Sequence, residues 1–125
     1  YCCDSAGLAS LIVLDAVNEA KAKGMTFSQL MAPIRCYANS GEMNFKIADK
    51  DAAITAALKA AETFGTPYGR EDVDGVRLEL TDGWVNIRKS NTEPYLRLIV
   101  EAKDPDVLAN RVKVLRDALK PFISE

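Results

Sequence analysis

The sequence predicts an α+β fold: a mostly antiparallel four-stranded sheet with two helices packed on one face, preceded by an extra N-terminal helix. From Met43 onward, the hydrophobic patterns follow the order strand, helix, strand, strand, strand, helix. Two of the strand segments flank an Asp-Gly pair, which is a strong hairpin signal. Both helical segments carry apolar residues at spacings of three and four, so each has a side that must cover a sheet.

The N-terminal segment predicts a helix that runs from about residue 5 to residue 23. Asp4 or Ser5 can cap its start, and Gly24 suits the position that follows a helix C-terminus. The apolar positions form one broad stripe, which comprises Leu8, Leu11, Ile12, Ala16 and Ala20 and is widened by Val13, Leu14 and Val17.

A short helical turn follows. Thr26 and Gln29 have the spacing of a capping box, and Pro33 ends the turn. Residues 34–41 are mixed in character and close on Asn-Ser-Gly. This stretch is interpreted as a linker between an incomplete first unit and a complete second one.

The second unit begins with a strand over Met43–Ile47. Asp49 or Asp51 can cap the next helix, whose apolar positions run from Ile54 to Phe64. Two alternating segments, 76–81 and 84–88, then surround the Asp-Gly pair at 82–83. A two-residue turn at this pair predicts that Leu80 lies opposite Val85 and that Arg77 lies opposite Arg88.

A further strand, Tyr95–Glu101, precedes the last helix. Asp104 can cap that helix, Pro105 suits its first position, and Pro121 limits its length. Because side chains alternate along a strand, one sheet face is apolar and meets the helices. The opposite, polar face carries Arg77, Glu79, Trp84, Asn86, Arg88, Tyr95 and Arg97.

Composition excludes several kinds of chemistry. The 125 residues include no histidine, so a Ser-His-Asp triad, a Cys-His dyad and an imidazole zinc site are all excluded. The three cysteines form no CxxC pair, which disfavours a redox motif and is typical of a reducing cytoplasm. Lys and Arg total 16 against 18 Asp and Glu, a net charge of -2, so a nucleic-acid partner is not expected. The longest apolar run, Leu11–Leu14, is too short to span a bilayer, so a membrane partner is not expected either.

The connection between the last two strands carries the densest polar chemistry. Residues 89–94 read Lys-Ser-Asn-Thr-Glu-Pro and lie between two arginines of the polar face. Hydroxyl groups, an amide, exposed backbone N–H groups and guanidinium forks suit a tetrahedral anion such as phosphate. The candidate phosphate-binding residues are Arg88, Ser90, Asn91, Thr92 and Arg97. Composition alone also allows a simple turn, with Asn91 in an Asx turn and both arginines solvated.

The motif Arg88-Lys89-Ser90-Asn91-Thr92-Glu93-Pro94, followed by Arg97, resembles the C-terminal phosphate-binding signature of the α-D-phosphohexomutase superfamily. The hairpin over 74–85 and the segment 40–45 also resemble its phosphomannomutase/phosphoglucomutase branch. Residues 1–7 resemble the segment that opens the last helix of that branch's sugar-binding domain.

This resemblance implies a domain division. Residues 1–36 correspond to the C-terminal helix of the preceding, third domain plus a linker, and residues 37–125 to the C-terminal phosphate-binding domain. In such enzymes the fourth domain clamps the phosphate that is not reacting, and Arg88, Ser90, Asn91, Thr92 and Arg97 match this clamp. The phosphoserine, metal and sugar loops have no counterpart here, so the chain is expected to hold no catalytic or metal-binding residues and to be inactive alone.

The resemblance also implies partners and cofactors. The partners are a hexose phosphate and the other three domains of a cytoplasmic parent enzyme, which would use Mg²⁺ and a hexose bisphosphate activator. The alternative is a non-catalytic binding module. In that case Trp84, Tyr95 and the arginines of the open sheet face would bind a protein or a single-stranded nucleic acid.

Overall fold

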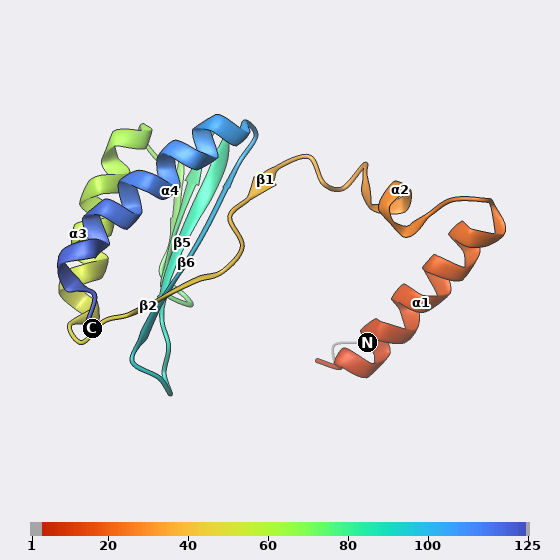
Figure 1. Cartoon of the computed structure of the whole chain (residues 1–125), viewed down its shortest axis with the longest axis horizontal. Helices are drawn as coiled ribbons and strands as arrows, with labels where there is room; N and C mark the ends of the chain where they lie inside the picture. The colour runs from red at the N-terminus through yellow and green to blue at the C-terminus, as the bar shows by residue number, and fades with distance from the viewer. Residues whose placement is uncertain (1–3, 125) are drawn as a thin grey trace. The chain divides into compact units, whose positions relative to one another are not determined.

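The computed structural model describes residues 4–124 and divides the chain into two compact units, Tyr1–Cys36 and Tyr37–Glu125 (Figure 1). The first unit contains α1 (Ala6–Ala22) and the short α2 (Phe27–Met31). The second unit contains, in order, β1 (Ala38–Asn39), β2 (Met43–Lys46), α3 (Lys50–Ala61), the 3₁₀ turn η1 (Glu62–Phe64), β3 (Gly69–Glu71), β4 (Val76–Leu80), β5 (Gly83–Lys89), β6 (Tyr95–Ala102), α4 (Pro105–Leu119) and the 3₁₀ turn η2 (Lys120–Phe122).

The helix ends follow the predicted capping residues. The Ser5 hydroxyl accepts a hydrogen bond from the Leu8 N–H at the start of α1, and Thr26 and Gln29 form the capping box of α2. Asp49 and Asp104 cap α3 and α4 in the same way. Short polar side chains before an apolar helix therefore predicted these helix starts correctly, because they satisfy N–H groups that no helical carbonyl can reach.

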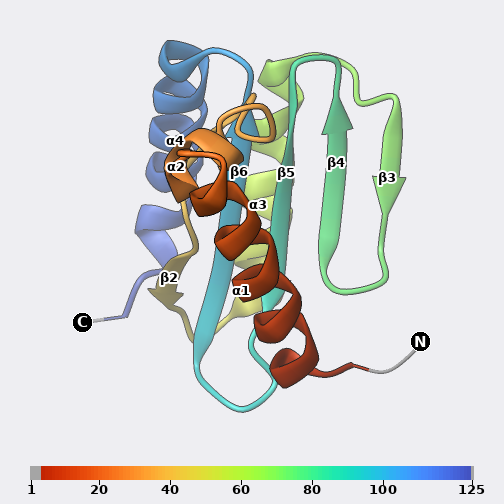
Figure 2. The same ribbon diagram turned by 90° about the vertical axis from the view of Figure 1, so that its right-hand side faces the viewer.

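The fold class is confirmed, but the sheet has six strands rather than the predicted four. Along the sheet the order is β1, β6, β5, β4, β3, and β2 also pairs with β6. Figure 2 shows β6, β5, β4 and β3 side by side. The two strands that were not predicted, β1 and β3, are two and three residues long, too short to show an alternating pattern. β1 lies within the stretch that was interpreted as a linker, and it pairs with Glu101 and Ala102.

The predicted hairpin register was wrong. Leu80 lies opposite Gly83 and Arg77 lies opposite Asn86, so the turn falls on residues 81–82. The glycine is needed for close approach to β6, because a Cβ on Gly83 would lie 2.0 Å from the Glu101 carbonyl oxygen. The predicted partners were displaced by two positions, which leaves every side chain on its predicted face.

The core lies between the sheet and the two helices α3 and α4, which cover one face (Figure 1). Small residues of α3, namely Ala53, Ala57 and Ala61, are fully or almost fully buried. The sheet contributes larger side chains, which are Leu78, Leu80, Val85, Ile87, Leu96, Leu98 and Val100. This core leaves the opposite face of the sheet for polar side chains.

The core of the second unit is built from residues of that unit. The core residues all lie at or beyond Met43, whereas the large apolar side chains of α1 are exposed, for example Leu11 at 66% and Ile12 at 61%. Within residues 4–124, no helix has the length and apolar character needed to cross a membrane.

A buried ion pair joins the hairpin turn to α4. Arg111 is only 4% exposed, and its Nη2 donates to Asp82 Oδ1 over 2.6 Å. The guanidinium also lies over the Phe64 ring at 5.4 Å. The hydrogen bond from Arg111 holds the pKa of Asp82 below its ordinary value of 3.8. The sequence analysis missed this pair, although Arg111 precedes the buried Leu115 and Leu119 at the four-residue spacing of one helix face.

We expect Asp82→Asn to lower the free energy of unfolding by about 1–3 kcal/mol at neutral pH, since it removes the charged partner of a buried guanidinium. The depressed pKa means that Asp82 stabilises the fold above pH 3.8 and that this contribution is lost as the pH falls through the lower folded-state value. Urea unfolding of the two proteins should therefore converge in acid. The matched control is Asp72→Asn, which breaks an exposed pair with Arg70 and should cost within about 0.5 kcal/mol.

We also expect residues 37–125 to fold without the first unit, because the core lies entirely within them. Thermal unfolding of the truncated and full chains measures this directly. A truncated protein without a cooperative transition would contradict it.

Candidate functional site

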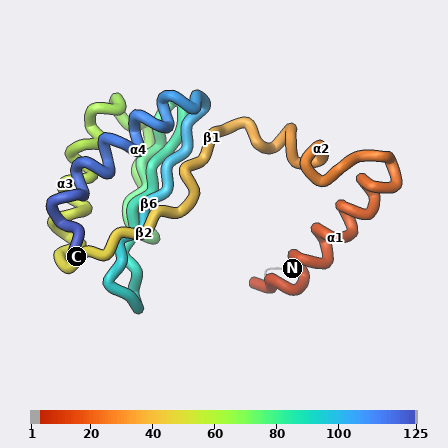
Figure 3. The backbone as a smooth tube through the Cα atoms, in the orientation of Figure 1, coloured from red at the N-terminus to blue at the C-terminus, as the bar shows by residue number. Residues whose placement is uncertain are grey.

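A polar cavity of about 200 Å³ lies where β5 ends and β6 begins. The connecting loop, residues 90–94, is the teal segment at the end of these strands in the backbone trace (Figure 3). All five predicted site residues line the cavity together with two others; the full set is Asp74, Arg88, Lys89, Ser90, Asn91, Thr92 and Arg97. The structure therefore brings together every residue that the motif analysis selected.

Two arginines stand directly opposite each other across the sheet. Arg88 of β5 pairs in register with Arg97 of β6, and Arg97 pairs in turn with Asn44 of β2. Arg88 was expected to face Arg77, but the corrected hairpin register gives that position to Asn86. Because the 90–94 loop connects β5 to β6, Arg88 and Arg97 both lie close to the loop backbone. Like charges on directly opposed residues are destabilising, and anions nearby offset this repulsion.

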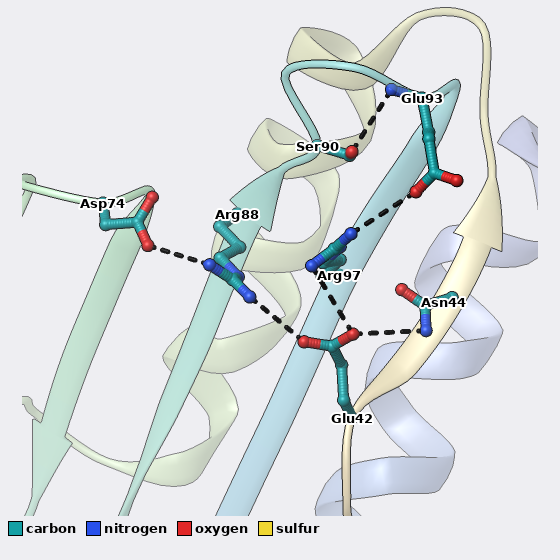
Figure 4. A network of polar contacts seen from close by, with 7 residues as sticks. All are labelled: Glu42, Asn44, Asp74, Arg88, Ser90, Glu93 and Arg97. Atoms are coloured by element: carbon teal, nitrogen blue, oxygen red, sulfur yellow. Dashed lines mark hydrogen bonds and ion pairs between the residues drawn. The ribbon is translucent and has the colours of Figure 1, made fainter. Parts of the chain in front are cut away.

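Three carboxylates surround the arginine pair (Figure 4). Glu42 lies between the two arginines, with one oxygen 3.1 Å from Arg88 Nη2 and the other 3.8 Å from Arg97 Nη1. Asp74 accepts from Arg88 Nη1 at 3.0 Å, and Glu93 accepts from Arg97 Nη2 at 3.4 Å. Glu42 is the one carboxylate, among the described residues, that the structure pairs with both guanidinium groups.

These contacts shift the pKa values of the groups involved. The hydrogen bond from Arg88 lowers the pKa of Glu42, assisted by Asn44 and by the charge of Arg97, against a smaller opposing effect of desolvation. The same bond to Glu42, followed by the one to Asp74, raises the pKa of Arg88. Both groups are therefore charged at neutral pH.

The backbone before Glu42 is fixed by two hydrogen bonds between Ser40 and Val100 of β6. Ser40 donates its N–H to the Val100 carbonyl, and its hydroxyl accepts the Val100 N–H, so one residue satisfies both groups of β6. Gly41 then takes a left-handed conformation, with φ +68°, which side chains disfavour. This turn separates β1 from β2 along the edge of β6 and places Glu42 beside Arg88 and Arg97.

A lysine of α3 holds the 90–94 loop through two backbone carbonyl groups. Lys50 Nζ donates to the carbonyl oxygens of Ser90 and Glu93, at 2.9 and 2.7 Å. In a planar trans peptide the N–H points opposite to the carbonyl, so the N–H of Asn91 points away from Lys50. The Ser90 hydroxyl accepts the Glu93 N–H and keeps its own proton for donation. Asn91 and Thr92 are exposed.

Sequence reasoning missed Glu42, Asp74 and Lys50 as members of this site. Lys50 carries a usable signal, since a cation in the first helical turn opposes the helix dipole and suggests another role. Glu42 immediately precedes β2 and Asn44 lies within it, so their two-residue spacing could also have placed both on the polar face. Asp74 shows no comparable pattern, because its contact with Arg88 spans 14 residues of hairpin.

One hydrogen-bond donor of Arg97 is left unused by the described residues. Arg97 Nε is buried and has no hydrogen-bond partner within residues 4–124. Its bonding capacity is therefore incompletely used in the structure. Within the same residues, no group of three or more His, Cys, Asp or Glu side chains could hold a metal ion.

Trp84, which lies on the same polar face, is held by two contacts within the chain. Trp84 donates its indole N–H to Glu101 at 2.8 Å, and Arg77 lies over its ring at 4.3 Å. One face of the tryptophan is therefore covered within the chain.

Comparison with known proteins identifies the family of this chain. Residues 42–118, well over half of the chain, match the family described as "Phosphoglucomutase/phosphomannomutase, C-terminal domain". A phosphomannomutase of Methanocaldococcus jannaschii is 31% identical over 112 residues, which cover 90% of this chain and 23% of that protein. A phosphomannomutase of Vibrio cholerae is 33% identical, with 94% and 25% covered. A probable phosphoglucosamine mutase of Methanosarcina acetivorans is 32% identical, with 96% and 26% covered.

A solved structure is also similar. The crystal structure of a phosphoglucomutase/phosphomannomutase family protein from Burkholderia thailandensis matches with a TM-score of 0.54 and 27% identity, covering 74% of this chain and 19% of that one. The chain thus spans about a quarter of the length of the curated relatives described above. The protein belongs to the phosphoglucomutase/phosphomannomutase family, and residues 42–118 form that family's C-terminal domain.

Proposed function

We propose that the cavity between Arg88, Arg97 and the 90–94 loop binds the phosphate group of a hexose phosphate. The observation that carries this proposal is the arginine pair, which stands in register on adjacent strands at the edge of a cavity lined by hydroxyl and amide groups. Guanidinium groups bind two phosphate oxygens at once, and two of them side by side match a tetrahedral anion.

The loop adds neutral donors to this charge. The Asn91 N–H points away from the lysine that holds the loop, and Ser90 and Thr92, which both carry hydroxyl groups, are among the residues that line the cavity. The unpartnered Arg97 Nε leaves one further donor that a small rotation of the guanidinium could bring to the anion. Donors of these kinds favour a phosphate over a flat carboxylate, because they approach from several directions.

In this proposal the domain is one part of a mutase that moves a phosphoryl group between the 1- and 6-positions of a hexose. The domain grips the phosphate that is not reacting, and its contribution to the rate is positioning and charge stabilisation. The phosphoserine, the Mg²⁺ site and the sugar-binding loop belong to the other three domains of the parent chain. The parent enzyme also uses a hexose bisphosphate as activator. A grip that accepts either phosphate of the bisphosphate would keep it bound while it turns around.

The alternative of a stacking module for nucleic acid or protein is disfavoured by one contact. Trp84, the candidate stacking residue, carries Arg77 over its ring and is tied to Glu101. A base could therefore stack on that face of the ring only by displacing the arginine.

We expect Arg88→Ala to lower kcat/KM of the full-length enzyme by about ten- to a hundredfold. It removes a charge-assisted contact worth roughly 1.5–3 kcal/mol. Arg88→Lys should restore only part of the activity, since an ammonium group cannot form the bidentate contact. The melting temperature should barely change, because the guanidinium lies on the face away from the core. An Arg88→Ala enzyme with unchanged kcat/KM would exclude the proposed phosphate site.

The 125-residue chain alone should not interconvert glucose 1-phosphate and glucose 6-phosphate in the presence of Mg²⁺ and a hexose bisphosphate. The assay should include the Arg88→Ala chain prepared in parallel, because a contaminating host mutase would give equal rates in both samples. Turnover by the native chain that exceeds this control would contradict the prediction.

A further inference from the structure

Glu42 occupies the place that an anion shared by Arg88 and Arg97 would take. Its two carboxylate oxygens lie 3.1 Å from one guanidinium and 3.8 Å from the other (Figure 4). Both arginines also line the neighbouring cavity, so a phosphate bound there would compete with this carboxylate for the same two guanidinium groups.

Charge favours replacement. Arg88 and Arg97 carry two positive charges and contact three carboxylates, those of Glu42, Asp74 and Glu93. The neighbouring Lys89 is paired with Asp51. With all of these contacts in place the arginine pair has no positive charge left over for a phosphate dianion, and Glu42 would stand within a few ångströms of the bound anion.

The three carboxylates are not equivalent. Asp74 and Glu93 each contact one arginine, and their side chains are 72% and 53% exposed. Glu42 contacts both arginines and is 34% exposed. Its backbone is held by the Ser40 contacts to β6, whereas its side chain has three rotatable bonds and open solvent on one side.

We propose that Glu42 is an internal competitor for the phosphate site: its carboxylate neutralises the arginine pair while the site is empty and is displaced when phosphate binds. The inference rests on the proposed phosphate-binding function and adds a residue that sets how tightly the phosphate is held. Glu42 acts through the two arginines and is therefore a positioning residue. The exchange of one anion for another keeps the guanidinium groups ordered in both states. It also lowers the affinity for phosphate, which suits an intermediate that must be released and rebound.

The test is phosphate binding by the full 125-residue chain, measured by calorimetry with inorganic phosphate. Removing a competing negative charge next to a dianion should tighten binding, so Glu42→Gln should bind phosphate about tenfold more tightly than the native chain. Glu42→Asp keeps the charge and should stay within a few-fold of the native affinity. Phosphate should also raise the melting temperature of Glu42→Gln more than that of the native chain, because the variant lacks the anion between its arginines.

Two further variants separate the possible failures. Glu79→Gln is the matched control, because Glu79 pairs with Arg77 on the same sheet face and touches neither arginine of the cavity. It should change the affinity less than twofold. Arg88→Ala should weaken binding at least tenfold if the phosphate site itself is correct.

The outcomes then divide cleanly. Weaker or unchanged binding by Glu42→Gln, with Arg88→Ala still impaired, would overturn the competitor role and leave the phosphate site standing. Equal tightening by Glu42→Gln and Glu79→Gln would also overturn it, since the effect would then be one of net charge. Arg88→Ala with native affinity, or no binding by either the native chain or Glu42→Gln, would overturn the phosphate site and the competitor role together.

Discussion

The repulsion between Arg88 and Arg97 is the constraint on which the rest of this site depends. Directly opposed residues on antiparallel strands have their Cβ atoms about 5 Å apart, so two guanidinium groups at these positions cannot avoid each other's field. Glu42, Asp74 and Glu93 supply the compensating charge within the chain. In the proposed function, an external phosphate would supply the same compensation, because guanidinium groups can each bind two of its oxygens.

The fold positions this pair through β6, which pairs with β5 on one side and with β1 and β2 on the other. The interruption between β1 and β2 would leave two ladder groups of Val100 unsatisfied. Ser40 satisfies both, with its backbone and its hydroxyl, and the turn at Gly41 then brings Glu42 to the arginines. On the opposite side, Lys50 holds two carbonyl groups of the loop and turns the Asn91 N–H away from the helix layer. Apolar burial on one face of the sheet thus fixes the frame, and local polar contacts adjust the site on the other.

Much of this could be read from the sequence because it depends on local patterns. Alternation and capping residues predicted the helices, the main strands and the two faces of the sheet. The loop motif selected Arg88, Ser90, Asn91, Thr92 and Arg97, all of which line one cavity. The errors arose where distant segments decide the outcome. Gly83 looked like a turn residue, but its role is to let Glu101 of β6 approach. Asp74, Glu42 and Arg111 meet partners 14, 46 and 29 residues away, and no local pattern encodes such pairings.

The central claim, that an anion offsets the repulsion of the arginine pair and that phosphate takes this role in place of Glu42, can be tested directly by NMR of the ¹³C,¹⁵N-labelled chain, which reports the arginine Nε–Hε groups and the Glu42 carboxyl group. The account predicts that inorganic phosphate shifts the Arg88 and Arg97 signals together, with one affinity, while the signals of Arg70 and Arg77 stay in place. It also predicts that the side-chain carboxyl signal of Glu42 moves toward that of a solvated glutamate over the same titration. Phosphate-dependent shifts that spare Arg88 and Arg97, or a Glu42 signal that does not move while both arginines respond, would contradict the account.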